Sequence, residues 1–107
     1  ASITGGSRAD GIRFSDGSSI KADLIVMAAG VRPNIQLAAS AGIAANRGFI
    51  VNQFMQTSKS NVYAVGECAE HNGMVYGLVA PLYEQGNVLA QHICGVPCEG
   101  YHGSAQS

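Results

Sequence analysis

Residues 57–67, TSKSNVYAVGE, constrain the fold of this chain more than any other segment. A polar stretch, 57–61, precedes four apolar residues, 62–65, and Gly66 and Glu67 follow at once. A short apolar run bounded by polar residues and a glycine is typical of a buried strand. In open α/β sheets, ligands bind beyond the carboxyl ends of the strands. We therefore expect a strand at 62–65 that ends beside a ligand site. The alternative is an ordinary strand-end turn with a solvated glutamate.

The remaining apolar segments predict further strands. Residues 12–21 alternate apolar and polar side chains around an Asp-Gly turn and predict a β-hairpin. Residues 24–29 are apolar without alternation and are stopped by Gly30. They predict a strand covered on both faces, as in a parallel sheet flanked by helices. Residues 48–51 predict another short strand.

Two helices are also expected. Asn34 is a good N-cap for a helix over 35–41, which Gly42 can close. A longer helix is expected over 81–94, because proline suits a first helical turn and a glycine follows the end. Its buried face is expected to consist of Leu82, Gly86, Leu89 and Ile93, which recur at helical spacing. Because Gly86 has no side chain, we expect a neighbouring backbone to approach the helix closely there.

Composition narrows the class of protein. Hydrophobic residues make up 47% of the 107 residues and charged residues only 12%, which leaves few charges to cover a free-standing domain. We therefore expect either oligomerisation or a place in a longer polypeptide, and the start without methionine favours the latter. The formal net charge of −1 predicts no nucleic-acid or membrane-surface binding, and no apolar run approaches the roughly 20 residues that span a bilayer. An odd number of cysteines argues against a disulfide framework and favours a cytoplasmic location.

The order of several motifs resembles the two-dinucleotide-fold flavoproteins, which include glutathione reductase, NADH oxidase and rubredoxin reductase. ADLIVMAAGVRPN at 22–34 is followed by GFIV at 48–51 and by the 57–67 segment. The continuation, CAEHNG at 68–73 and YGLVAPLYEQ at 76–85, is more specific. It is similar to the large subunit of the assimilatory NAD(P)H-dependent nitrite reductase. The resemblance extends from residue 12 to about residue 104.

This resemblance implies an α/β fold, namely part of a glutathione reductase-like FAD/NAD(P)-binding flavoprotein with a β-hairpin, parallel-type strands and a C-terminal helix. Residues 1–32 would end the NAD(P)-binding domain, and 33–97 would form the C-terminal segment of the FAD-binding domain. Residues 98–107 would lead into the next domain.

The resemblance also implies which residues contact the cofactor. Gly66 and Glu67 would face the ribityl and pyrophosphate part of FAD, although many relatives have aspartate in place of the glutamate. Val79 and Ala80 would present backbone N–H groups to the isoalloxazine edge, which fits the preference of helix N-termini for electron-rich atoms.

In the parent enzyme that the resemblance implies, a hydride passes from NAD(P)H to FAD, and electrons continue to siroheme and an iron–sulfur cluster that reduce nitrite to ammonia. This chain has no G-x-G-x-x-G and no C-x-x-C motif, so the phosphate-binding turns and metal centres would lie in the remainder of the parent polypeptide. We expect no catalytic residue, metal ligand, tightly bound FAD or activity in these 107 residues alone. The choice between NADH and NADPH stays open.

Two alternatives remain. A sister flavoenzyme, like rubredoxin reductase or NADH oxidase, would hand electrons to rubredoxin or to oxygen. In a different class, the chain alone would be a non-catalytic structural module that self-associates as a homo-oligomer. The apolar strands expected at 24–29 and 62–65 lack half of their expected neighbours, and unpaired apolar edges promote association.

The other reactive side chains suggest mainly structural roles. Cys94 and Cys98 cannot share a helix face as metal ligands, because a glycine and a proline intervene; we expect the first to be packed and the second exposed. Cys68 is either a flavin-proximal thiol or a buried packing residue. Residues 32–34, Arg-Pro-Asn, either touch a nucleotide phosphate or form a crossover turn and helix cap. The histidines have no companions at ligand spacing and are expected at the surface: His71, His92 and His102.

Overall fold

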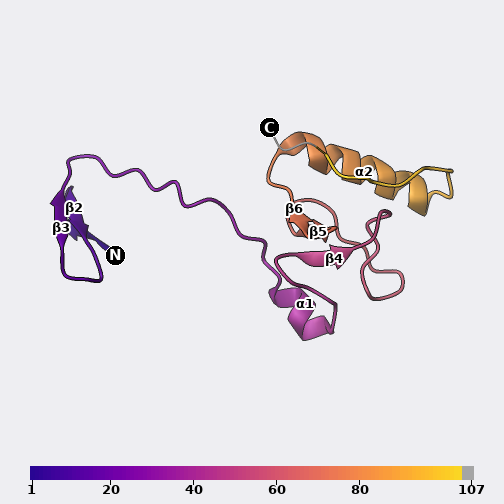
Figure 1. The fold of residues 1–107 in the computed structure, drawn as a ribbon, viewed down its shortest axis with the longest axis horizontal. Coiled ribbons are helices and arrows are strands. Elements are labelled where there is room, and N and C mark those ends of the chain that lie inside the picture. The colour runs from indigo at the N-terminus through magenta and orange to yellow at the C-terminus, as the bar shows by residue number, and fades with distance from the viewer. Residues whose placement is uncertain (105–107) are drawn as a thin grey trace. The chain divides into compact units, whose positions relative to one another are not determined.

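The computed structural model describes residues 1–104, which fall into two units, Ala1–Gly30 and a second that begins at Val31 (Figure 1). Each unit has its own sheet. The last part of the expected linker, 105–107, lies outside the described residues.

The first unit holds an antiparallel sheet in the order β1-β2-β3. Its strands are β1 (Ser2–Gly5), β2 (Ala9–Arg13) and β3 (Ser19–Lys21). The predicted hairpin is confirmed, with Ile12 opposite Ile20. Its turn is closed by the side chain of Asp16, whose Oδ1 accepts the Ser18 N–H at 2.9 Å. Strand β1 was not expected from the sequence.

The strand predicted at 24–29 is wrong, because this segment has no regular secondary structure. Three of its side chains are almost fully exposed, with 80% of Leu24, 78% of Val26 and 86% of Met27 accessible. A strand needs a neighbour to receive its backbone hydrogen bonds. No strand within residues 1–104 pairs with this segment.

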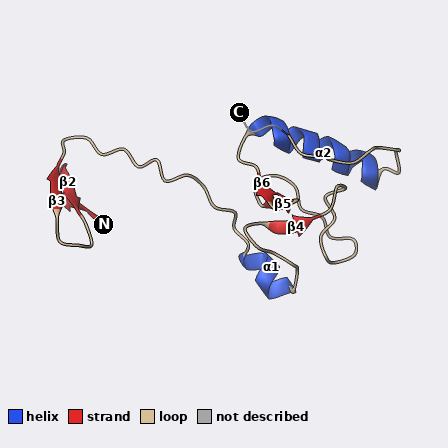
Figure 2. Ribbon diagram, viewed as in Figure 1, coloured by secondary structure: helices blue, strands red, loops and turns tan. Residues whose placement is uncertain are grey.

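The second unit contains a mixed sheet in the order β4-β5-β6 (Figure 2). Strand β4 (Phe49–Val51) confirms the prediction at 48–51, and it runs parallel to β5 (Ala69–His71). Strand β6 (Met74–Val75) returns antiparallel to β5. The turn between them is Asn72-Gly73, with φ values of 50° and 76°. An Asn-Gly pair of this kind is a strong hairpin signal, and it was overlooked in the sequence.

The strand predicted at 62–65 is also wrong. Within residues 62–65, Tyr63 makes an isolated β-bridge to Gln56 and the other three residues have no regular secondary structure. Ala64 is buried and its N–H donates to the Met55 carbonyl at 3.0 Å, whereas Val62 and Val65 are more than a third exposed. The segment therefore contributes Ala64 to the core, and within residues 1–104 no named strand pairs with it.

Both predicted helices form. Helix α1 (Gln36–Ala41) begins one residue later than expected, after Ile35. Asn34 still acts at its start, since its Oδ1 accepts the Gln36 N–H at 3.1 Å. Gly42 ends the helix in the left-handed conformation, as predicted.

Helix α2 (Val79–Ile93) begins two residues before the predicted start, so that Pro81 lies in its first turn. Its most buried residues are Pro81 and Gln85. Leu82 and Leu89 pack against the core as expected. Ile93, however, is 61% exposed, so the predicted face is wrong at its C-terminal end.

The core of the second unit is formed by α1, β4, β5 and residues of the intervening and following loops, and α2 packs against it through partly buried side chains. Its buried hydrophobic members are Ala38, Phe49, Val51, Met55, Ala64, Ala69, Tyr76 and Tyr101. Tyr101 belongs to the expected linker, but it is 3% exposed and its N–H donates to the Gln53 carbonyl at 2.7 Å. Within residues 1–104, neither helix has the length and apolar character needed to cross a membrane.

Candidate functional site

Gly66 lies where the chain leaves the core after Ala64. Its φ of +95° is a backbone conformation that L side chains rarely adopt. A Cβ built on Gly66 would meet no heavy atom within 4 Å among the described residues. The backbone here is therefore open to the close approach of another group. Its contact with FAD stays a prediction.

Glu67 presents its carboxylate at the surface. Within residues 1–104 this carboxylate has no hydrogen-bond or ion-pair partner, so its oxygens can accept from hydroxyl groups. It lines a cavity of about 40 Å³ whose other lining residues are Val31, Arg32, Pro33, Val75, Tyr76 and Gly77. The last two precede α2 in the chain.

Val79 and Ala80 are the first two residues of α2. Val79 is 67% exposed, and among the described residues no side chain caps this end of the helix. The first four N–H groups of an α-helix have no partner inside the helix, and here the proline at the third position removes one of them. The start of α2 therefore offers backbone donors to an electron-rich atom.

One hydrogen bond links the Gly66 backbone to the second turn of α2. The Gly66 N–H donates to Oε1 of Gln85 at 3.1 Å, which joins α2 to the backbone beside Glu67. We call Gly66, Glu67, Val79 and Ala80 the predicted flavin-contact residues. Together they provide an open backbone, a carboxylate acceptor and helix N–H donors. This set fits FAD, which carries ribityl and ribose hydroxyls and carbonyl oxygens.

Glu70 is a buried carboxylate that sequence analysis missed. It is 4% exposed, and Oε2 accepts the N–H groups of Arg47 (2.7 Å) and Gly48 (3.0 Å), while Oε1 accepts from the Asn46 side chain (3.1 Å). The pKa of Glu70 is lowered, mainly by the Gly48 N–H and further by Asn46 and by the N–H and charge of Arg47; burial opposes this shift. Glu70 thus fastens the turn before β4 to β5, three residues after Glu67.

His71 corrects the prediction that the histidines lie at the surface. It is 3% exposed and packs against Tyr101, with ring centroids 5.2 Å apart. Burial, and next the charge of His102, lower the pKa of His71, so the neutral ring is favoured. Its Nδ1 is buried without a hydrogen-bond partner among the described residues. His102 is exposed, and His92 is half-buried against Phe54, with ring centroids 4.8 Å apart.

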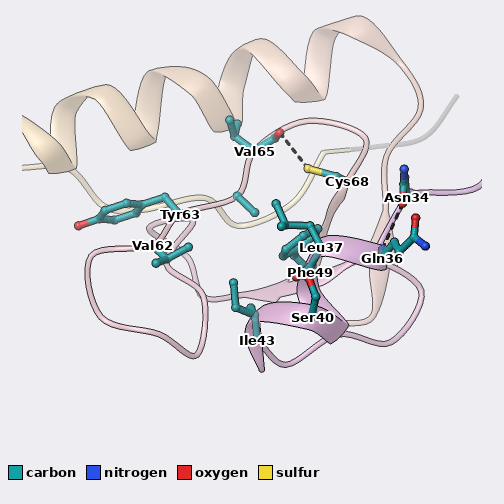
Figure 3. A pocket seen from close by; sticks show the side chains of 11 residues that line it. Asn34, Gln36, Leu37, Ser40, Ile43, Phe49, Val62, Tyr63, Val65 and Cys68 are labelled. Atoms are coloured by element: carbon teal, nitrogen blue, oxygen red, sulfur yellow. Dashed lines mark hydrogen bonds between the residues drawn. The ribbon is translucent and has the colours of Figure 1, made fainter.

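A cavity of about 790 Å³ lies elsewhere, between α1 and residues 62–68 (Figure 3). None of the predicted flavin-contact residues lines it, and its walls are mainly apolar. Cys68 is one wall residue; its thiol donates to the Val65 carbonyl at 3.5 Å and it packs against the core. These contacts favour the packing role for Cys68. The size and character of this cavity mark an uncovered apolar surface beside the 62–65 segment.

The other two cysteines have the reverse of the expected burial. Cys94 ends α2 and is exposed, whereas Cys98 is half-buried with its thiol 4.0 Å from the Val88 carbonyl. No group of three or more acidic, histidine or cysteine side chains within residues 1–104 could hold a metal ion. Asn34 hydrogen-bonds at the α1 start, which supports the turn and cap role of residues 32–34. Contact of this segment with a nucleotide phosphate stays a prediction.

Comparisons with known proteins give a consistent picture. The family model described as "Pyridine nucleotide-disulphide oxidoreductase" matches residues 2–89. The chain is 76% identical, over 99% of its length, to the assimilatory nitrate reductase electron transfer subunit of Bacillus subtilis. It is 60% identical, over 98% of its length, to the nitrite reductase [NAD(P)H] of the same organism. A rubredoxin-NAD(+) reductase of Alcanivorax borkumensis is 39% identical over 84% of the chain.

A solved structure has a fold similar to that of this chain. The ferredoxin reductase of Rhodopseudomonas palustris matches 96% of the chain with a TM-score of 0.80 and 32% sequence identity. The chain spans 27% of that structure's chain. It spans only 14% and 13% of the two Bacillus proteins and 24% of the rubredoxin reductase.

Proposed function

Because the chain belongs to the pyridine nucleotide-disulphide oxidoreductase family, we propose that it forms one wall of the FAD site in an NAD(P)H-dependent flavoprotein. When bound, FAD would supply the redox chemistry, taking a hydride from the nicotinamide and releasing electrons onward. The residues of this chain bind and orient the cofactor. The observation that carries the proposal is the junction of the Gly66 backbone with α2 through Gln85. It joins the open Gly66 backbone, next to the exposed Glu67, to the helix that begins at Val79.

Each predicted flavin-contact residue has a distinct part. Gly66 leaves its open surroundings free of a side chain, and its φ of +95° favours glycine at this position. Glu67 accepts hydrogen bonds from cofactor hydroxyls. Val79 and Ala80 direct backbone N–H groups of α2 toward the flavin ring.

We further propose that the electrons serve the reduction of nitrate or nitrite. The 76% identity to a nitrate reductase electron transfer subunit favours delivery of electrons to nitrate reduction. The 60% identity to a nitrite reductase supports the second candidate, reduction of nitrite to ammonia within the same polypeptide. In that case siroheme and an iron–sulfur cluster would lie in the remainder of the parent. Transfer to rubredoxin has weaker support, at 39% identity.

The parent would act in the cytoplasm, where NAD(P)H is available. The 107-residue chain alone would be inactive and would associate with copies of itself, because its apolar surfaces need the remainder of the parent to cover them.

A turnover experiment on the full-length protein separates these candidates. NADH or NADPH should reduce a bound flavin, and ferricyanide should sustain nucleotide oxidation. If added nitrite then sustains oxidation with formation of ammonia, the protein is a nitrite reductase. If ferricyanide works but nitrite does not, it is an electron transfer subunit for another component. A protein with no flavin, or with flavin that neither nucleotide reduces, would contradict the proposed function.

A further inference from the structure

Residues 98–104, which were expected to form a linker, lie against the folded second unit, and we call them the C-terminal strap. The strap runs back along α2 (Figure 1). At its start the Cys98 thiol lies 4.0 Å from the Val88 carbonyl, and at its end the Ser104 hydroxyl donates to the Glu84 carboxylate. The chain therefore returns from the C-terminal half of α2 toward the N-terminal end of this helix.

Tyr101 anchors the strap in the core. It is 3% exposed, and its ring packs against His71 and Tyr76, with ring centroids 5.2 Å and 5.7 Å away. Its N–H donates to the Gln53 carbonyl at 2.7 Å. Its hydroxyl lies 2.9 Å from Ser104 Oγ, and Tyr101 is the donor there because the serine hydroxyl already donates to a carboxylate. These contacts make the strap part of the folded unit.

The strap reaches the surroundings of the predicted flavin-contact residues on two sides. Through Glu84 it holds α2, whose first N–H groups are the expected donors to the flavin. Glu84 lies five residues after the start of α2, which is about 7 Å along the helix axis. Through Tyr101 the strap packs against Tyr76, which lines the same cavity as Glu67. It thus joins the helix with the donors to the wall beside the carboxylate.

We propose that the C-terminal strap is a brace that positions the predicted flavin-contact residues for FAD, with Tyr101 as the positioning residue. The inference rests on the proposed function. Tyr101 does not line the cavity beside Glu67, so it acts through its neighbours, Tyr76 on one side and Ser104 with Glu84 on the other. Coupling of this kind is reciprocal: a strap that favours FAD binding must itself be held more firmly once FAD is bound.

The first test measures the Kd for FAD of the full-length protein, by fluorescence titration after removal of the flavin. Tyr101→Ala removes the anchor and should raise the Kd at least about five-fold, the lower end of usual coupling between sites. Tyr101→Phe keeps the ring contacts and loses one hydrogen bond, so its Kd should lie between those of the wild type and the alanine variant. Tyr83→Ala is the matched control, since this α2 tyrosine is 72% exposed; its Kd should stay within about two-fold of the wild type.

Ile43→Ala separates positioning from a general loss of stability. Ile43 packs against the same core but lines the cavity beside α1, not the one beside Glu67. This variant should unfold at a lower urea concentration while its Kd for FAD stays within about two-fold of the wild type. If Tyr101→Ala does not fold, Ser104→Ala takes its place, because it frees the strap from Glu84 alone; it should raise the Kd about three-fold.

Hydrogen exchange in the wild type tests the reciprocal effect. The Tyr101 amide, which donates to the Gln53 carbonyl, exchanges when the strap opens locally. Addition of FAD should slow this exchange by about the factor by which loss of the anchor raises the Kd.

The outcomes distinguish the inference from the proposed function. A wild type that binds FAD, together with a folded Tyr101→Ala variant of equal affinity, overturns the inference and leaves the proposed function intact. The inference is also overturned if Ile43→Ala loses as much affinity as the strap variant, or if FAD leaves exchange of the Tyr101 amide unchanged. Where Ser104→Ala decides, equal affinity has the same meaning. A wild type that binds no FAD overturns the proposed function and the inference with it.

Discussion

At the scale of single residues, Glu70 shows how a charge can be buried at low cost. Three donors surround its two oxygens, two of them backbone N–H groups that the turn at 46–48 would otherwise leave unpaired. Gly48 is needed in this turn because a Cβ there would lie 2.7 Å from the Cys68 carbonyl oxygen. The carboxylate therefore joins two segments whose backbones are in close contact.

Glu70→Gln should lower the free energy of unfolding by about 2 kcal/mol at pH 7, since the amide has one acceptor oxygen and turns a donor toward backbone N–H groups. The folded-state pKa of Glu70 lies below 4.5, the ordinary value for a glutamate side chain. Its contribution is therefore complete above pH 4.5 and is lost as pH falls through the folded-state value. Urea denaturation between pH 3 and 7 measures both effects.

The control is Glu99→Gln, which changes an exposed glutamate. It should alter stability by less than about 0.5 kcal/mol. If Glu70→Gln were as stable as this control at pH 7, or kept the acid sensitivity of the wild type, the hydrogen bonds of the Glu70 carboxylate would not stabilise the fold.

At the scale of elements, helix α2 contains Gly86, although no close contact among the described residues requires a glycine there. Sequence analysis expected Gly86 to let another backbone approach, but within residues 1–104 a Cβ at this position would meet no heavy atom within 4 Å. Gly86→Ala should therefore stabilise the chain by about 0.5–1 kcal/mol, through the higher helix propensity of alanine.

Thermal unfolding followed by circular dichroism measures this gain. The reverse change at an exposed α2 position, Ala90→Gly, should destabilise by a similar amount. A loss of stability in Gly86→Ala would show that a neighbouring backbone does approach the helix there.

The elements that the sequence predicted are those whose signals are local. Gly42 and Pro81 mark helix ends by their own backbone properties, and both helices form. The strands at 24–29 and 62–65 were inferred from apolarity, which reports burial in a sheet but not the presence of a neighbouring strand. Strand β5 was missed because Glu70 and His71 are ionisable and do not look like a buried strand.

The candidate site shows the same difference between local sequence signals and contacts of residues far apart in the chain. Gly66 and Glu67 were found because a glycine and an acid after an apolar run are visible in the sequence. Gln85 was not found, because its role arises from a contact with Gly66 nineteen residues away. Long-range pairs of this kind leave no local pattern.

At the scale of the whole molecule, many large apolar side chains remain exposed within residues 1–104, among them Leu24, Val26 and Met27 of the 24–29 segment. The cavity beside residues 62–65 adds a mainly apolar surface. We predict that the 107-residue chain self-associates at micromolar concentration, as measured by light scattering. Lysines on exposed strand-like segments oppose pairing, so Leu24→Lys with Val26→Lys should reduce the average mass. A monomeric wild type would contradict this prediction.

The central claim is that this chain supplies an FAD wall in which Glu67 accepts hydrogen bonds from the cofactor. The most direct test is the Kd for FAD of the full-length protein carrying Glu67→Ala or Glu67→Asp. Removal of a charged acceptor should raise the Kd at least about ten-fold. Aspartate keeps the acceptor and should remain within about three-fold of the wild type. Equal FAD affinity of the wild type and Glu67→Ala would contradict the account.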